Sequence, residues 1–156
     1  MKLIPLNKNK YAIIDDEDYE TLSRYSWSVI CTKKGKEYAV RWIPGSIKFM
    51  HREILNAPTN RIVDHKDGNG LNNQKGNIRI CTYSQNNASA RKRTGCASIY
   101  KGVEWSRSKR KWRSRIGVSK GRKVHIGYFS NERDAAIAYD KKAKEVYGEF
   151  AYINFP

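Results

Sequence analysis

The segment from residue 62 to residue 91 limits the possible folds of this chain more than any other part. Two short apolar runs, residues 62–63 and 78–82, flank a loop that contains an Asp-Gly and an Asn-Gly turn pair. A polar stretch that suits a short helix follows at residues 83–91. The pattern therefore predicts a strand, a loop, a returning strand and a helix, in that order.

His65 ends the first of these strands and lies between two acidic residues, Asp64 and Asp67. An imidazole with a pKa near neutrality can take a proton from water, and a neighbouring carboxylate can hold a hard cation. These are the groups that metal-assisted cleavage of a phosphodiester requires. Asp-Gly and Asn-Gly pairs are also ordinary turn chemistry, so the loop alone leaves a purely structural role open.

The positive charge of the chain is concentrated in residues 91–156. This part holds 17 of the 31 Lys and Arg residues but only 6 of the 15 Asp and Glu residues. From Arg91 to Lys123 there are 13 basic residues and one acid, Glu104. Such a field attracts polyanions, and aromatic residues interleave with the charges, so double-stranded DNA is the predicted partner. A solvated basic face that serves solubility is the alternative.

The three cysteines, Cys31, Cys81 and Cys96, are odd in number and never form a Cys-x-x-Cys pair. They predict small buried side chains rather than disulfides or a structural zinc site. No apolar stretch approaches the roughly 20 residues that span a bilayer, and the first apolar run is too short for a signal peptide. We expect an intracellular monomer, in the cytoplasm of a bacterial or phage-infected cell and associated with the nucleoid, with no membrane or protein partner.

In the first third of the chain, short strand-like runs alternate with polar breaks. Residues 11–14 form an apolar run, and the acids that follow begin a predicted helix that extends to residue 25. Residues 27–31 and 38–42 alternate with period two around a Lys-Lys-Gly-Lys turn and predict a hairpin. Residues 50–55 predict one or two helical turns.

From residue 99 the pattern predicts three strands and then one helix. In residues 111–118 basic residues alternate with residues that can pack, so one face of this strand is cationic. Asn131 is the predicted N-cap of the helix and Gly148 its stop. The fold class expected for the whole chain is α+β, with domains at residues 1–92 and 93–156.

Residues in the first domain resemble the HNH nucleases, in particular the homing endonucleases of phage and intron origin. The matching positions are Asp64, His65, Lys66, Asp67, Gly68, Asn69, Asn72, Asn73, Asn77, Ile78, Arg79, Thr82, Gln85, Asn86 and Asn87. The resemblance extends over most of residues 3–90, including residues 12–19 and 50–52. It implies a ββα-metal site, in which the two strands and the helix of residues 62–91 hold one divalent cation.

The resemblance also implies a role for each matching residue. His65 is the expected general base, and Asn77 is expected to pin the loop that carries it. Asp64 and Asn86 are the expected metal ligands, with Asn87 left open as the second ligand. The expected cofactor is Mg²⁺, with Mn²⁺ as a substitute, because a hard cation takes oxygen ligands and keeps several waters.

Residues 99–156 resemble the plant Apetala-2/ethylene-response-factor DNA-binding domain. The match rests on Tyr100-Lys-Gly-Val103, Lys111-Trp112, Ile126-Gly-Tyr-Phe129, residues 135–140 and residues 151–156. It implies a small three-stranded antiparallel sheet that is backed by one helix and reads the major groove. The residues expected to face DNA are Lys101, Lys111, Trp112, Arg113, Arg115, Lys123 and His125.

The chain also departs from the plant pattern. Glu104 and Ser106 stand where the pattern has arginines, and His125 stands where it has tryptophan. Base readout is therefore expected to differ, and no plant target sequence can be transferred.

Together these features predict a site-specific, metal-dependent DNA endonuclease, a hydrolase whose C-terminal domain finds the target. Two alternatives stay open: a DNA-binding regulator with an inactive HNH module, and an HNH nuclease used in restriction or packaging. His51 is also left open, between a contact with DNA or the metal site and a packed side chain.

Overall fold

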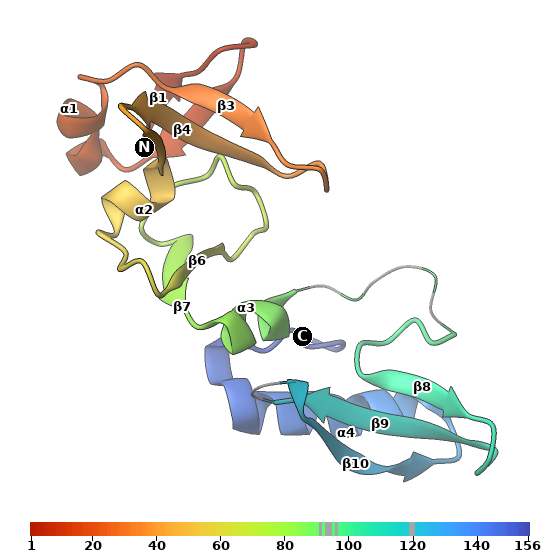
Figure 1. The fold of residues 1–156 in the computed structure, drawn as a ribbon. Coiled ribbons are helices and arrows are strands. Elements are labelled where there is room, and N and C mark those ends of the chain that lie inside the picture. The colour runs from red at the N-terminus through yellow and green to blue at the C-terminus, as the bar shows by residue number, and fades with distance from the viewer. Residues whose placement is uncertain (91, 93–94, 96, 119–120) are drawn as a thin grey trace. The chain divides into compact units, whose positions relative to one another are not determined.

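The computed structural model describes residues 1–90, 92, 95, 97–118 and 121–156. The chain divides into two compact units, Met1–Thr82 and Tyr83–Pro156 (Figure 1). Both units combine helices with small antiparallel sheets, which confirms the predicted α+β class.

The first unit opens with a hairpin of β1 (Lys2–Pro5) and β2 (Tyr11–Ile14). A 3-10 turn, η1 (Asp16–Asp18), and a single-turn helix, α1 (Tyr19–Leu22), follow. The helix predicted to extend to residue 25 is therefore wrong in length. The carbonyl of Leu22 accepts a hydrogen bond from Trp27 Nε1 at 2.8 Å, so a tertiary contact takes the place of the next helical turn.

A three-stranded sheet follows, formed by β3 (Ser28–Cys31), β4 (Glu37–Ile43) and β5 (Ser46–Phe49) in that order. The predicted hairpin of β3 and β4 is confirmed, whereas β5 was not foreseen. The core of the unit joins the β1–β2 hairpin and the β3–β5 sheet to two helices through Ile4, Leu6, Ala12, Ile14, Leu22, Trp27, Val29, Ala39 and Met50.

The helical turn predicted near residue 50 is confirmed as α2 (Met50–Ile54). Beyond it, β6 (Ile62–His65) and β7 (Ile78–Cys81) pair antiparallel, and α3 (Tyr83–Ser89) follows. The predicted order of strand, loop, strand and helix is thus present in the chain. The helix groups with the second unit.

Two parts of the sequence interpretation concern residues outside the described ones: the predicted helix end at Arg91, and Cys96. The other two cysteines are free thiols. Cys81 is buried as predicted, whereas Cys31 is exposed, so the buried position predicted for it is wrong.

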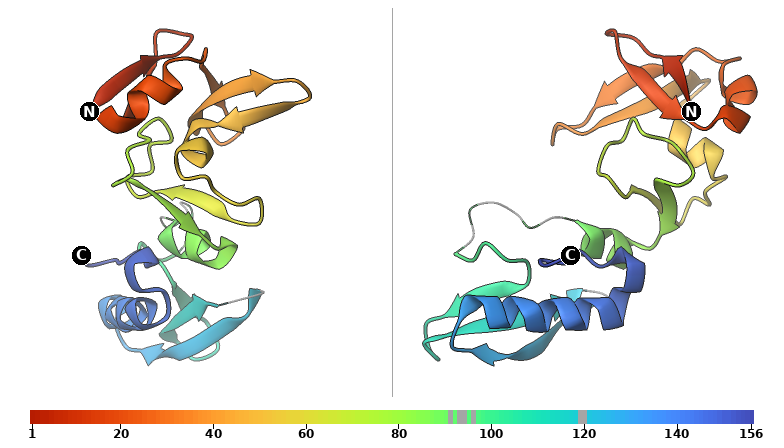
Figure 2. Two further views of the ribbon diagram at one scale, coloured as in Figure 1. Left: turned by 90° about the vertical axis from the view of Figure 1, so that its left-hand side faces the viewer. Right: turned by 180° about the vertical axis from the view of Figure 1, so that it is seen from behind.

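The second unit is built on a sheet of β8 (Val103–Ser106), β9 (Lys111–Gly117) and β10 (Lys123–Phe129), with β9 in the middle. A long helix, α4 (Glu132–Tyr147), lies along one face of this sheet, and a short 3-10 turn, η3 (Gly148–Phe150), follows it (Figure 2). The three strands and one helix expected from the sequence are therefore confirmed.

Both predicted ends of α4 are also confirmed. The side chain of Asn131 accepts a hydrogen bond from Asp134 N at 2.7 Å, and Gly148 ends the helix with φ of 53°. Beneath the helix, Ala135, Ala136, Tyr139 and Ala143 pack against the sheet. None of the helices in the described parts of the chain is long and apolar enough to cross a membrane.

Candidate active site and DNA-binding face

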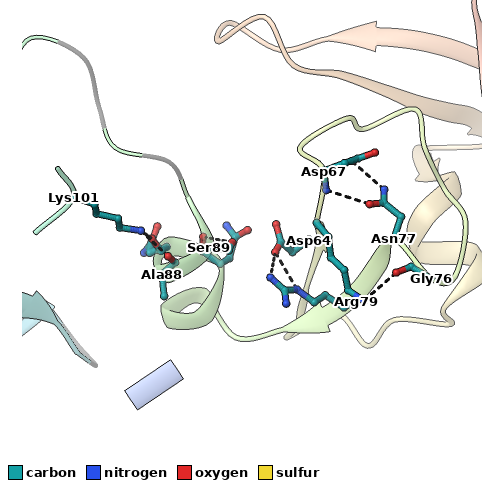
Figure 3. A network of polar contacts seen from close by, with 11 residues as sticks. Asp64, Asp67, Gly76, Asn77, Arg79, Ala88, Ser89 and Lys101 are labelled. Atoms are coloured by element: carbon teal, nitrogen blue, oxygen red, sulfur yellow. Dashed lines mark hydrogen bonds and ion pairs between the residues drawn. The ribbon is translucent and has the colours of Figure 1, made fainter. Parts of the chain in front are cut away.

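The β6–β7 hairpin turns Asp64 and His65 to opposite faces, because successive residues of a strand alternate. Asp64 lies opposite Arg79 on β7 and accepts hydrogen bonds from its guanidinium (Figure 3). The distances to Asp64 Oδ2 are 3.1 Å from Nη2 and 3.3 Å from Nε. Both side chains are only 14% exposed, so the ion pair fixes the direction of the carboxylate.

His65 is buried among aromatic rings at the end of β6. The ring centroids of Tyr38 and His51 lie 6.0 Å and 5.1 Å from its own. Burial lowers the pKa of His65 below its ordinary value, against the opposing effects of a hydrogen bond to Asn73 and of nearby carboxylates. The imidazole is therefore neutral at neutral pH, which is the form that accepts a proton.

Asn73, which is fully buried, orients this imidazole. Its Nδ2 donates to the carbonyl of Leu71 at 3.1 Å, which leaves Oδ1 facing His65 Nε2 at 3.4 Å. A carboxamide oxygen can only accept, so Nε2 carries the hydrogen and Nδ1 keeps its lone pair. Asn73 is one of the positions that match the HNH pattern in the sequence. Its role in orienting His65 follows only from the structure.

Asn77 connects the two ends of the loop between β6 and β7 (Figure 3). Its Oδ1 accepts from Asp67 N at 3.1 Å, and its Nδ2 donates to Asp67 Oδ1 at 3.0 Å and to Asn72 O at 2.8 Å. The carbonyl of Asn77 also accepts from Lys66 N at 2.9 Å. These contacts fit a residue that pins the loop beside His65.

His51 on α2 is a second buried histidine beside the candidate base. Its ring meets that of His65 edge to face, with 87° between the planes. Burial, and then the charges of His65 and Arg52, lower its pKa to about 3. Its Nδ1 has no hydrogen-bond partner in the part of the chain that the structure describes. The geometry favours a packed, neutral ring over a contact with DNA.

The groups available for a metal ion are few. No cluster of three or more His, Cys, Asp and Glu side chains that could hold one is present among the described residues. A Mg²⁺ ion that keeps waters and binds DNA phosphate needs little more than one carboxylate and one amide from the protein. Asp64 is such a carboxylate, and α3 carries two candidate amides, the part-buried Asn86 and the exposed Asn87. In their chemistry, as oxygen donors, these side chains suit such an ion.

In the second unit, one face of the sheet carries the basic side chains, which alternate along β9 with residues that pack under α4. Strand pairing places His125 beside Arg115, and Lys123 beside Gly117, on the same side. We call this surface the cationic face; its residues are Glu104, Lys111, Arg113, Arg115, Lys123, His125 and Tyr128. Lys111, Lys123, His125 and Tyr128 are exposed, and the rings of His125 and Tyr128 lie 4.7 Å apart.

Trp112 lies on the opposite face of β9 from the arginines. It packs with Val103 and Ala136 in the core under α4, and its ring meets that of Trp105 edge to face at 5.2 Å. This placement argues against the DNA contact predicted for Trp112, because the helix covers that face of the sheet.

Lys101 does not lie on the cationic face either. Its ammonium donates to three carbonyls at the end of α3, those of Asn87, Ala88 and Ala90, at 3.2, 2.5 and 2.6 Å (Figure 3). Burial lowers the pKa of Lys101 to about 8. The residue closes the C-terminal end of a helix, and a DNA contact by Lys101 would require these bonds to break.

Comparison with known proteins places the chain in a family. An uncharacterized HNH endonuclease of Acanthamoeba polyphaga mimivirus is 31% identical over 157 residues, which cover 97% of this chain and 79% of the relative. The chain therefore belongs to the HNH endonuclease family.

Shorter matches involve plant DNA-binding proteins. Dehydration-responsive element-binding protein 2D of Arabidopsis thaliana is 40% identical over 58 residues, and an AP2-like ethylene-responsive transcription factor of the same plant is 42% identical over 60 residues. These matches cover 36% and 38% of this chain but only 28% and 12% of the plant proteins. No family model and no solved structure matches the chain.

Proposed function

We propose that the protein is a site-specific, metal-dependent DNA endonuclease of the homing type. The observation that carries this proposal is the β6–β7 hairpin, whose first strand ends with a fixed carboxylate, Asp64, on one face and a buried neutral imidazole, His65, on the other. Membership of the HNH endonuclease family supports it. The cationic face of the second unit supports a DNA substrate, because its exposed basic side chains attract a polyanion.

In this proposal His65 acts as the general base. Nε2 stays protonated against Asn73 Oδ1, so Nδ1 is the atom that takes the proton from the attacking water. Asn77 keeps the loop after His65 in place through its bonds to Asp67 and Asn72. Hydrolysis then leaves 5′-phosphate and 3′-hydroxyl ends.

Asp64 and Asn86 are the proposed ligands of Mg²⁺, for which Mn²⁺ can substitute, and Asn87 is the alternative to Asn86. When bound, such an ion supplies Lewis-acid stabilisation of the charge that develops on the phosphate and the leaving oxygen. The protein contributes the fixed carboxylate, because Arg79 already holds Asp64 in one direction.

Binding and site choice are assigned to the cationic face. We propose that Lys111, Lys123 and His125 contact phosphates or base edges, and that Arg113 and Arg115 read the major groove. A DNA-binding regulator with an inactive nuclease module is the second candidate, and it predicts binding without cleavage.

The deciding experiment is a nicking assay on supercoiled plasmid with Mg²⁺ or with EDTA. Wild type should cleave only with the metal. His65→Ala should lower the rate by about 10²- to 10⁴-fold, the usual contribution of a general base, while duplex binding in EDTA stays unchanged. Full cleavage by His65→Ala would refute the assignment, and binding without cleavage by wild type would establish the regulator instead.

A further inference from the structure

Glu104 occupies an unexpected position at the centre of the cationic face. It lies on β8 directly opposite Arg113, and it is the single acid between residues 91 and 123. Arg113 Nε and Nη2 lie 2.7 and 2.6 Å from Glu104 Oε1. Arg115 Nε lies 2.6 Å from Oε1, and its Nη2 donates to Oε2 at 2.6 Å. One carboxylate thus binds two guanidinium groups.

Stability is a poor explanation for this arrangement. Each of the three side chains keeps about a third of its surface exposed, at 33–35%. Ion pairs that are this exposed contribute little to folding because water and salt screen them. The effect of the carboxylate is therefore geometric: it holds two long and otherwise mobile side chains in fixed positions.

A guanidinium has five N–H groups in a rigid fork, and Glu104 engages only one edge of each fork. Tyr128, which lies opposite Arg113 on β10, is a second hydrogen-bonding neighbour of that guanidinium. The N–H groups that Glu104 does not engage can meet a ligand. Guanine presents two acceptors in the major groove, O6 and N7, that match such a fork. Ordering the arginines before binding removes part of the entropic cost of that contact.

The carboxylate also has a second effect. It places a negative charge in the middle of a basic surface, where it opposes DNA phosphates that approach in the wrong register. Selectivity between DNA sequences is a difference in affinity. Repulsion that weakens binding to wrong sequences increases it, as does attraction that strengthens binding to the right one.

We propose that Glu104 determines the sequence specificity of the cationic face by positioning Arg113 and Arg115 for base edges and by repelling phosphate. The inference rests on the proposed role of this face in reading duplex DNA. It predicts that removing the charge changes two properties in opposite directions: non-specific affinity rises while selectivity falls.

The test uses the full-length protein with a randomised duplex pool in EDTA, so that no cleavage occurs. Wild type and Glu104→Gln are compared by sequencing the bound fraction, and by affinity for one duplex of arbitrary sequence at about 0.1 M salt. For Glu104→Gln, affinity for the arbitrary duplex should rise by up to about 8-fold for each new phosphate contact. Enrichment of the preferred sequences should fall by about 5- to 150-fold, the range expected for one well-made guanine contact.

Glu145→Gln is the matched control, because it makes the same charge change on α4, on the other side of the sheet. It should leave enrichment at the wild-type level. Glu104→Asp keeps the charge, and it should recover part of the selectivity. Circular dichroism of each variant checks that the fold is retained.

Wild-type enrichment by Glu104→Gln would overturn the inference, as would an equal loss of enrichment in Glu145→Gln. If wild type itself enriches no sequence, both the inference and the reader role of the face fail. The nicking assay would still report separately on the nuclease module.

Discussion

At the scale of single residues, the candidate base gains its properties from neighbours that are distant in sequence. His65 contacts Tyr38 on β4, His51 on α2 and Asn73 in the following loop. The sequence could predict His65 and Asp64, because they are adjacent and match a known spacing. It could not predict that the rings of His51 and Tyr38 contact His65, because those contacts depend on how α2 and the β3–β5 sheet pack against the hairpin.

The second buried histidine leads to a prediction about stability and pH. The pKa of His51 is about 3 in the folded protein against an ordinary value of 6.5. Between these values the unfolded chain binds a proton that the folded chain does not, so the free energy of unfolding falls as pH is lowered through this window. From pH 7.5 to pH 5 the loss due to His51 should be about 2 kcal/mol.

Urea denaturation at the two pH values measures this loss. His51→Gln cannot titrate and should lose about 2 kcal/mol less than wild type over the same interval. Equal pH dependence in both proteins would show that His51 is not held neutral. Each protein needs a two-state transition for the comparison to be valid.

At the scale of elements, α3 carries the two asparagines that are candidates for the amide ligand of the metal. It packs within the second unit. Ser84 Oγ donates to Val118 O, Tyr152 N donates to Ala88 O, and Lys101 closes the C-terminal end. Contacts within the second unit therefore hold α3, the helix that carries the amides proposed as metal ligands.

The two adjacent asparagines can be separated by metal titration of the nicking reaction. Asn86→Ala should raise the Mg²⁺ concentration for half-maximal cleavage by at least about tenfold, since even the loss of a residue that supports a metal ligand costs this much. Asn87→Ala is the matched control and should have a smaller effect. If Asn87→Ala instead has the larger effect on the Mg²⁺ requirement, Asn87 is the ligand.

A lysine substitution tests how α3 is held. Lys101→Met removes three hydrogen bonds from a charged donor to the last carbonyls of the helix. A hydrogen bond from a charged donor contributes about 1.5–3 kcal/mol. The loss of even one of these bonds should therefore accelerate amide exchange in α3 by at least about tenfold.

Lys109→Met, at an exposed turn between β8 and β9, is the matched control and should leave exchange in α3 unchanged. DNA affinity gives a second measure. If Lys101 binds phosphate instead, Lys101→Met will weaken binding while exchange in α3 stays at the wild-type rate.

The elements also show which parts of the fold follow from local sequence. The strands of the second sheet and both ends of α4 were predictable, because alternation and capping residues are local signals. The strand β5 was missed although its four residues alternate between polar and apolar after a Pro-Gly turn, because a run this short is a weak signal by itself. The length of α1 was missed because the contact of Trp27 with Leu22 is tertiary.

At the scale of the whole molecule, the uneven charge should appear in the salt dependence of binding. For duplex DNA the logarithm of affinity falls by about 0.9 per logarithmic unit of salt for each phosphate contacted. Lys123→Gln on the cationic face should therefore reduce the slope by about 0.9.

Lys141→Gln makes the same charge change at an exposed position of α4 and should leave the slope unchanged. Filter binding or fluorescence anisotropy from 50 to 300 mM salt, roughly the range over which such slopes are linear, provides the measurement. Equal slopes for Lys123→Gln and wild type would remove Lys123 from the binding face.

The buried thiol of Cys81 can be used to measure how readily the β6–β7 hairpin opens. Cys81 is 2% exposed and lies opposite Ile62, in the strand pair that carries Asp64 and His65. In a protein whose other two cysteines are replaced by serine, a thiol reagent can label Cys81 only when this pair opens. When opening and closing are fast relative to labelling, the labelling rate reports the fraction of molecules in which the hairpin is open. Binding of metal or DNA to the closed form should lower that fraction, so a ligand can be detected even under conditions in which no bond is cut.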